Sequence, residues 1–148
     1  MIIKNMTKEH LCAVLSIERD SFTHPWSEGA FVSELEKDSA YCIVATIDDK
    51  VVGYAVLSIV LDEGSLLDIA VDKAYRRQGV AKALFDKMSE IAKDCKLSFI
   101  TLEVRSSSTP AISLYNAMGF ERVAVRKNYY SSPVEDAVLM TKFLRTGD

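Results

Sequence analysis

A change in hydrophobic period near residue 79 limits the fold of this chain more than any other feature. Before that point come three short β-rich runs, Tyr41–Thr46, Val51–Val60 and Ser65–Val71. From Gly79 to Lys93, apolar residues recur at about every fourth position, which predicts an amphipathic helix. A strand at Leu97–Val104 follows, in which Ile100, Leu102 and Val104 alternate with Thr101, Glu103 and Arg105. A meander that leads into a strand–helix–strand crossover predicts a mixed sheet with helices on both faces.

The other segments extend this pattern into one expected α/β domain over residues 1–148. A short strand at Ile2–Lys4 precedes two helices that Thr7 and Ser27 can cap, and the first of these carries Leu11, Val14, Leu15 and Glu18 at helical spacing. After the crossover, a helix opens at Thr109–Pro110 and closes at Gly119. Two strands, at about Phe120–Tyr130 and Ala137–Phe143, complete the predicted order β-α-α-β-β-β-α-β-α-β-β.

Composition excludes several classes of ligand. The 18 Lys and Arg residues against 21 Asp and Glu leave a net charge of −3, which disfavours nucleic acid because phosphate binding needs a basic face. The widely spaced Cys12, Cys42 and Cys95 predict buried free thiols and no metal site or disulfide. The chain lacks an apolar run of about 18 residues, the length of a membrane span, and it starts without a signal peptide pattern. We therefore expect a soluble, cytoplasmic protein with no membrane partner.

The most specific local motif is R-x-x-G-x-[GA], which lies between a predicted strand and a helix as Arg76-Arg77-Gln78-Gly79-Val80-Ala81. Glycine lets the backbone turn tightly beside a ligand, and free N–H groups at a helix start attract anions. The spacing suits a pyrophosphate and lacks the lysine of the nucleoside-triphosphate loop. An ordinary helix start with two solvated arginines is the alternative.

Two further side chains are candidates for proton transfer. Glu103 follows apolar residues near the end of its strand, where a carboxylate can act as a general base or pair with Arg105 on the same face. Tyr115 lies within a predicted helix, where it can be a proton donor or a core tyrosine. Trp26, Tyr129 and Tyr130 lie in loops or at strand ends, where they either line a peptide groove or belong to the core.

Taken together, these segments resemble the GNAT superfamily of acetyl-CoA-dependent N-acetyltransferases. Within it the chain is similar to the bacterial group that acetylates the N-terminal alanine of a ribosomal protein. The matching stretches are Phe22 with Pro25–Ser27, Val60–Glu63, Asp68–Val71, Arg76–Ala81, Leu102–Arg105, Ala111–Tyr115, Gly119–Phe120, Arg126–Tyr130 and Glu135–Ala137. The resemblance implies a GNAT-type fold with a mostly antiparallel central sheet of about seven strands and helices on both faces.

The resemblance also implies a role for each site residue. Glu103 would be the general base and Tyr115 the general acid, while Trp26, Tyr129 and Tyr130 would contact the substrate. Asp68 and Ser108 stand where the family commonly has Asn. The residues implied in binding acetyl-CoA, with no metal, are Ile69, Ala70, Val71, Arg76, Arg77, Gln78, Gly79, Val80, Ala81, Lys82 and Ser108.

The acceptor amine must be neutral to attack, and this favours an α-amine. An N-terminal amine of pKa near 7.8 is roughly 30% neutral at about pH 7.4, while a lysine of pKa near 10.4 is about 0.1% neutral. By resemblance, the expected substrate is the N-terminal alanine of the eighteenth small-subunit ribosomal protein, acetylated by direct transfer in a ternary complex. The alternatives are acetylation of lysine side chains or a small amine, and an acyl-CoA-binding module without catalysis.

Overall fold

The structure of this protein is a computed structural model that describes residues 1–144. Within this range the strands are β1 (Ile2–Asn5), β2 (Ala40–Ile47), β3 (Lys50–Val60), β4 (Glu63–Val71), β5 (Phe99–Arg105), β6 (Glu121–Tyr130) and β7 (Glu135–Phe143). The α-helices are α1 (Leu11–Ser21), α2 (Glu28–Leu35), α3 (Val80–Asp94) and α4 (Thr109–Ala117). Short 3-10 turns, η1 (Lys8–His10) and η2 (Lys73–Tyr75), precede α1 and α3. This order of elements agrees with the predicted one.

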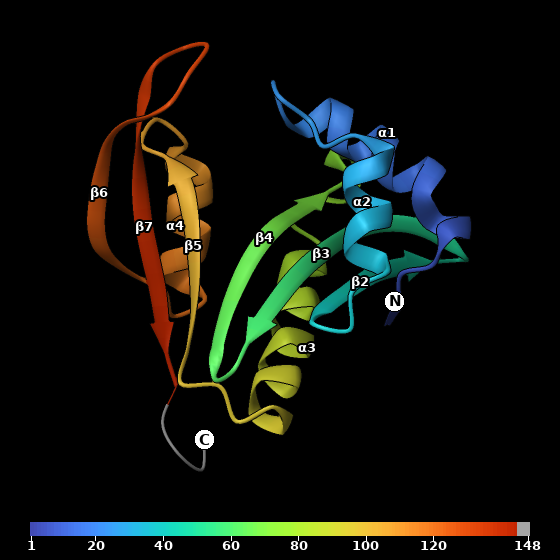
Figure 1. The fold of residues 1–148 in the computed structure, drawn as a ribbon. Helices are drawn as coiled ribbons and strands as arrows, with labels where there is room; N and C mark the ends of the chain where they lie inside the picture. The colour runs from blue at the N-terminus through green and yellow to red at the C-terminus, as the bar shows by residue number, and fades with distance from the viewer. Residues whose placement is uncertain (145–148) are drawn as a thin grey trace.

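The strands form one seven-stranded sheet in the order β1-β2-β3-β4-β5-β7-β6 (Figure 1). Every neighbouring pair is antiparallel except β4 and β5, which are parallel because α3 connects them as a crossover. The parallel pairing covers only Glu63–Ser65 of β4 and Phe99–Thr101 of β5. Beyond it the two strands diverge toward their C-terminal ends (Figure 1). The predicted mixed, mostly antiparallel sheet is confirmed, and it opens into a gap between these two strands.

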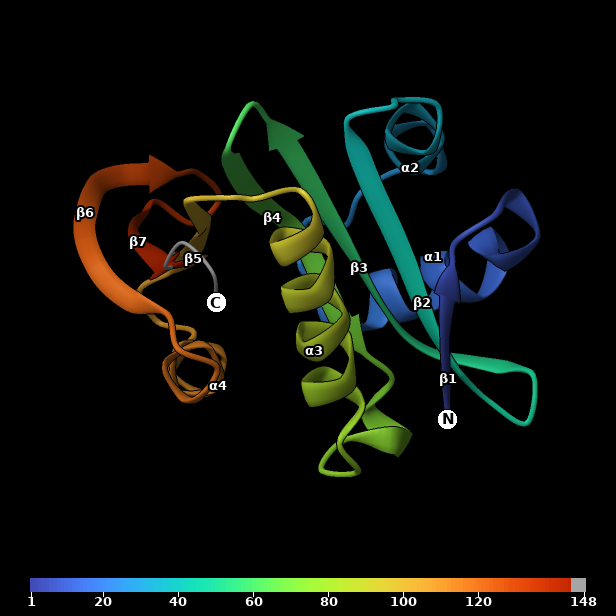
Figure 2. The same ribbon diagram turned by 90° about the horizontal axis from the view of Figure 1, so that it is seen from below.

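Helices cover both faces of the sheet, as predicted (Figure 2). On one face α3 and α4 pack over a core that includes Leu84, Phe85 and Ile112. On the other face α1 and α2 pack over a second core that includes Val14, Phe31 and Tyr54. Because neither α1 nor α2 extends over β5, this second face stays open beside the gap (Figure 1).

Several local predictions hold, and two need correction. The Ser27 hydroxyl accepts the Ala30 N–H at 3.1 Å and caps α2, and Gly119 follows α4 with φ 96°. Thr7, however, starts the η1 turn and not α1 itself. The three cysteines are free, but Cys12 is exposed because it lies on the face of α1 opposite the buried Val14.

Candidate active site

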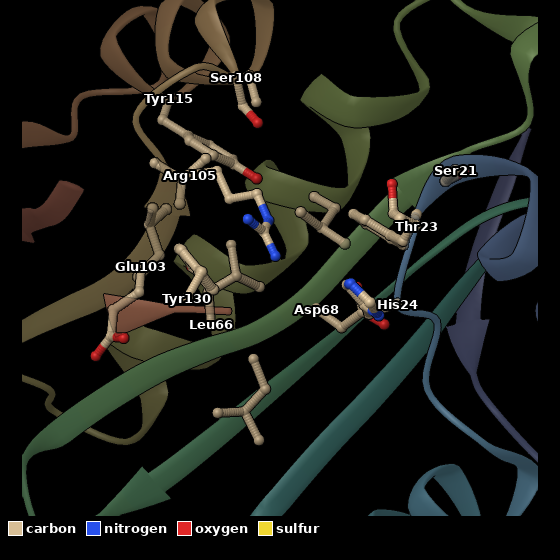
Figure 3. A pocket seen from close by; sticks show the side chains of 16 residues that line it. Ser21, Thr23, His24, Leu66, Asp68, Glu103, Arg105, Ser108, Tyr115 and Tyr130 are labelled. Carbon is tan, nitrogen blue, oxygen red and sulfur yellow. The ribbon is translucent and has the colours of Figure 1, made fainter. Parts of the chain in front are cut away.

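A pocket of about 350 Å³ lies where β4 and β5 diverge (Figure 3). Its walls come from β4, β5, α4, the end of β6 and the loop that follows α1. The lining residues are Ser21, Phe22, Thr23, His24, Leu66, Leu67, Asp68, Ile69, Leu102, Glu103, Val104, Arg105, Ser108, Ala111, Tyr115 and Tyr130. The divergence of the two strands therefore brings together both predicted proton-transfer residues, although they lie on different elements.

The edge of β4 that faces the gap carries backbone groups without a strand partner. Asp72 donates its N–H to the Val52 carbonyl at 2.8 Å, so the backbone of Asp72 faces β3. The backbone N–H and C=O groups of successive residues point to opposite sides of a strand. The backbone groups of Ala70 therefore also face β3, while those of Ile69 and Val71 face the gap. Arg76 Nε lies 3.4 Å from the Val71 carbonyl at the end of this edge. An extended ligand with amide groups can therefore pair with Ile69 and Val71, but not with Ala70, along β4.

The predicted anion-binding segment lies at the start of α3. Gly79 has φ 81° and Arg77 has φ 62°, so the chain turns sharply before the helix begins. A Cβ on Gly79 would meet nothing within 4 Å, so the backbone conformation and not a lack of space favours glycine here. Ala83 donates to the Gly79 carbonyl at 3.0 Å, which leaves the N–H groups of Val80, Ala81 and Lys82 without an acceptor within the helix. Free N–H groups at a helix start suit the pyrophosphate of a coenzyme A.

Side chains of the predicted anion-binding segment make their own contacts on the protein surface. Lys82 pairs with Asp86 at 2.9 Å on the exposed surface, and the Gln78 side chain donates to the Ala74 carbonyl at 3.4 Å. Ser108 lies at the N-cap of α4 and lines the pocket at its other wall. The structure thus places the implied coenzyme residues along the C-terminal end of β4, the start of α3 and the start of α4.

Glu103 lies on the open face of β5, because Leu102 and Val104 on either side are buried against α3 and α4. Its carboxylate Oε1 lies 3.8 Å from Arg126 Nη2, and 28% of its side chain is exposed. The alternative of an ion pair with Arg105 is wrong, since Arg105 instead pairs with Glu135 at 3.3 Å. Glu103 also raises the pKa of Tyr129, first by hydrogen bonding and then by its charge. Glu103 is thus partly solvated and open to the pocket, as a proton acceptor needs to be.

Tyr115 projects from α4 into the pocket (Figure 3). Its ring contacts those of Phe85 and Phe120 edge-on, each with a centroid separation of 6.1 Å. Burial, followed by the charges of Asp68 and Tyr130, raises the pKa of Tyr115 to about 12. The phenol is therefore protonated throughout the neutral range and is available as a proton donor.

The three candidate substrate aromatics are not gathered in one place. Tyr130 lines the pocket, and the Arg105 guanidinium lies 4.4 Å from the centre of its ring. Tyr129 is half exposed and packs edge-on against Tyr130, outside the lining. Trp26 packs on Phe31 at 5.0 Å, on the α1–α2 face of the sheet. Of the three, Tyr130 alone is part of the pocket wall within residues 1–144.

Several pocket residues were missed by the sequence reasoning. Arg105 donates to the carbonyls of Pro133 and Ser131 at 3.2 and 3.4 Å, so it holds the β6–β7 loop beside the pocket. His24 Nε2 donates to the Ser132 carbonyl at 2.7 Å, which links the loop after α1 to the same β6–β7 loop. These contacts join residues up to 108 positions apart. No local sequence signal predicts such contacts, because they depend on how the sheet brings the loops together.

Residues 1–144 contain no group of three or more His, Cys, Asp or Glu side chains that could hold a metal ion. No helix in the same range is both long and apolar enough to cross a bilayer.

Comparison with known proteins relates the chain to a family of acetyltransferases. Residues 11–120 match the model of the acetyltransferase (GNAT) family. The [ribosomal protein bS18]-alanine N-acetyltransferase of Escherichia coli (strain K12) is 34% identical over 140 residues, which cover 93% of this chain and 94% of that protein. A Bacillus subtilis protein described as a candidate for the same activity is 37% identical over 139 residues, with 93% and 92% covered.

A solved structure of a related enzyme agrees with the match to the acetyltransferase (GNAT) family. The crystal structure of the ribosomal-protein-S18-alanine N-acetyltransferase from Escherichia coli superposes with a TM-score of 0.90 at 32% identity, covering 99% of this chain and 96% of that one. The chain therefore belongs to the GNAT family of acetyltransferases. It is an enzyme of the acyltransferase class, and the coenzyme of this family is acetyl-CoA.

Proposed function

We propose that this enzyme acetylates the α-amino group of a protein N-terminal alanine, with ribosomal protein bS18 as its substrate. The observation that carries this proposal is the shared pocket of Glu103 and Tyr115, which opens beside the unpaired edge of β4. The similarity to proteins named for this activity supports the choice of acceptor. The reaction would take place in the cytoplasm, where ribosomal proteins are made. One acetyltransferase domain, residues 1–148, would carry it out.

Acetyl-CoA supplies an acetyl group that is activated as a thioester. The backbone of Ile69 and Val71 would pair with its extended arm along the β4 edge. The N–H groups at the start of α3 would bind its pyrophosphate, aided by the helix dipole and by Arg76 and Arg77. A backbone N–H on the β4 edge would stabilise negative charge that develops on the acetyl oxygen.

Glu103 and Tyr115 would move the protons. The Glu103 carboxylate removes a proton from the acceptor nitrogen, either directly or through one water molecule. Tyr115, which keeps its proton because its pKa is raised to about 12, donates that proton to the departing sulfur. Both substrates bind together, so positioning supplies much of the rate and no covalent enzyme intermediate is required. Cys12, Cys42 and Cys95 lie outside the pocket lining, in agreement with direct transfer.

The shape of the acceptor side supports a peptide substrate. Tyr130 and Arg105 form one wall, and the loop after α1 forms the opposite wall with Phe22 and His24. The link from His24 to Ser132 joins the two loops that border this end of the pocket. A chain terminus enters such a confined space more readily than the middle of a folded chain.

The proposal is tested by thiol release from acetyl-CoA with two peptides of matched length. One begins with a free alanine, and the other has a blocked N-terminus and a single internal lysine. Strong release with the alanine peptide alone is expected, and mass spectrometry should place the acetyl group on the α-nitrogen. Release with the lysine peptide alone would move the enzyme to the side-chain class. Failure with both peptides while coenzyme binds would refute the peptide acceptor.

A further inference from the structure

Arg105, the last residue of β5, stands on the acceptor side of the pocket. It follows Glu103 by two positions, so both side chains project from the open face of the strand. Figure 3 shows Arg105 beside Tyr130, on the same side of the pocket as Glu103. The predicted anion-binding segment follows β4 instead, on the other strand of the diverging pair. Arg105 therefore lies close to the place where an acceptor nitrogen would meet Glu103.

The Arg105 guanidinium is occupied by three oxygens of the protein itself. Its Nη1 donates to the Pro133 carbonyl at 3.2 Å and to Glu135 Oε1 at 3.3 Å, while its Nη2 donates to the Ser131 carbonyl at 3.4 Å. The Glu135 carboxylate also offsets its positive charge. Only 24% of the Arg105 side chain is exposed. A guanidinium held in this way is poorly suited to bind a coenzyme phosphate, so its contacts shape the pocket wall.

Glu135, at the start of β7, holds Arg105 in place. Its Oε2 accepts the Ser107 N–H at 2.6 Å and the Ser106 hydroxyl at 3.3 Å, while its Oε1 accepts from Arg105. Hydrogen bonds from Ser107, and then from Arg105 and Ser106, lower the pKa of Glu135, so it stays a carboxylate at neutral pH. Both carboxylate oxygens have donors. The ion pair is thus fixed between the turn after β5 and the β6–β7 loop.

Tyr130 is the pocket residue that this ion pair holds. It ends β6 directly opposite Glu135 in the ladder with β7. The Arg105 guanidinium carbon lies 4.4 Å from the centre of its ring, and the carbonyl of the next residue, Ser131, accepts from Arg105. A planar guanidinium can stack on a ring while its N–H fork bonds to nearby oxygens, a combination that a lysine ammonium cannot make. Arg105 therefore fixes both the ring and the chain that follows it.

We propose that the ion pair of Arg105 and Glu135 positions Tyr130 for the acceptor peptide, and so sets the affinity of the enzyme for peptide and not for CoA. The inference rests on the proposed function, which supplies the peptide. Arg105 and Glu135 are positioning residues, because they act on the acceptor through Tyr130. Without the ion pair, peptide binding would carry the entropy cost of ordering the ring and the loop.

The test is steady-state kinetics of thiol release from acetyl-CoA with a peptide that begins with a free alanine. The variant Arg105→Lys keeps the positive charge but loses the planar fork, so KM for the peptide should rise about tenfold. Its kcat should stay within about threefold, and its CoA affinity in calorimetry within about twofold. The variant Glu135→Gln keeps the shape of the side chain and removes its charge, so the peptide KM should rise at least about threefold.

A Tyr130→Leu background separates positioning from a general effect on the fold. Tyr130→Leu alone should raise the peptide KM. If Arg105 acts through Tyr130, the addition of Arg105→Lys should raise KM by less than about twofold further. The matched control is Arg122→Lys, at an exposed position of β6 that pairs with the core residue Met140 and so lies on the opposite face of the sheet. This control should leave the peptide KM unchanged.

An unchanged peptide KM in Arg105→Lys, or in Glu135→Gln if Arg105→Lys does not fold, would overturn the inference. Equal losses in peptide KM and CoA affinity would also overturn it, because they indicate a general change in the fold. A full tenfold effect of Arg105→Lys in the Tyr130→Leu background would do the same. Each of these results removes this inference alone when the unaltered enzyme acetylates the alanine peptide. Lack of turnover with that peptide would instead refute the proposed function.

Discussion

The hydrogen bond from Tyr54 to Glu18 should contribute measurably to stability. Tyr54 is completely buried, and its ring packs edge-on against Phe31 with a centroid separation of 5.8 Å. The variant Tyr54→Phe keeps this ring packing and removes only the hydroxyl that Glu18 accepts. A hydrogen bond to a charged group contributes about 1.5–3 kcal/mol, so the free energy of unfolding should fall by about that amount.

Urea unfolding and thermal melting measure this change. For a chain of this size 1 kcal/mol corresponds to about 2–4 °C, so the melting temperature should fall by roughly 3–12 °C. The matched control is Tyr41→Phe, which removes a hydroxyl that is 3.4 Å from Cys95 Sγ on a residue that is 37% exposed. That change should stay within about 0.5 kcal/mol.

A double-mutant cycle separates the hydrogen bond from other effects of the substitutions. If Tyr54 and Glu18 interact, the combination of Tyr54→Phe with Glu18→Gln should cost less than the sum of the two single changes. Additive costs, or equal small losses for Tyr54→Phe and Tyr41→Phe, would show that the buried hydroxyl does not stabilise Glu18. The inference that this hydrogen bond ties α1 to β3 would then be refuted.

Three further variants test the site itself. Glu103→Gln should lower kcat by about 10²–10⁴-fold with unchanged CoA affinity in calorimetry, and near-normal turnover would remove Glu103 as the base. Tyr115→Phe should lower kcat by at least about tenfold. In the unaltered enzyme the pKa of Tyr115 is raised to about 12, so Tyr115 should keep its proton at pH 10. A profile of kcat from pH 7 to 10 should therefore show no loss of this proton donor. Gly79→Ala forces a side chain into a left-handed conformation at a cost of about 1–2 kcal/mol and should weaken CoA binding about tenfold. Gly29→Ala, in α2, is its control and should leave CoA binding unchanged, so equal effects would contradict the role of the turn.

Local physical rules account for the parts of the fold that the sequence predicts well. The alternation along Phe99–Arg105 places Leu102 and Val104 in the core and Glu103 on the open face, as predicted. Ser27 caps its helix through its own hydroxyl, and Gly119 ends another with a positive φ. Each of these outcomes depends on neighbours within a few residues, so the pattern of residue types is sufficient to predict it.

Partners distant in sequence required the tertiary structure. The sequence places Glu18 at a helical core position but does not show that Tyr54, 36 residues away, donates to its carboxylate. The sequence left an ion pair between Arg105 and Glu103 as one alternative. In the structure β7 lies beside β5, so Glu135 at the start of β7 pairs with Arg105 instead. Such pairs are chosen by strand order, which depends on the packing of the whole sheet.

The chain's residues by themselves thus determined the family, the order of elements and the pair of proton-transfer candidates. Only the tertiary structure decided that β4 and β5 pair over three residues and then diverge. That divergence creates the pocket and exposes the backbone of Ile69 and Val71 along the edge of β4. The physical reason is that a gap between strands arises from long-range packing on both faces of the sheet, which no local periodicity encodes.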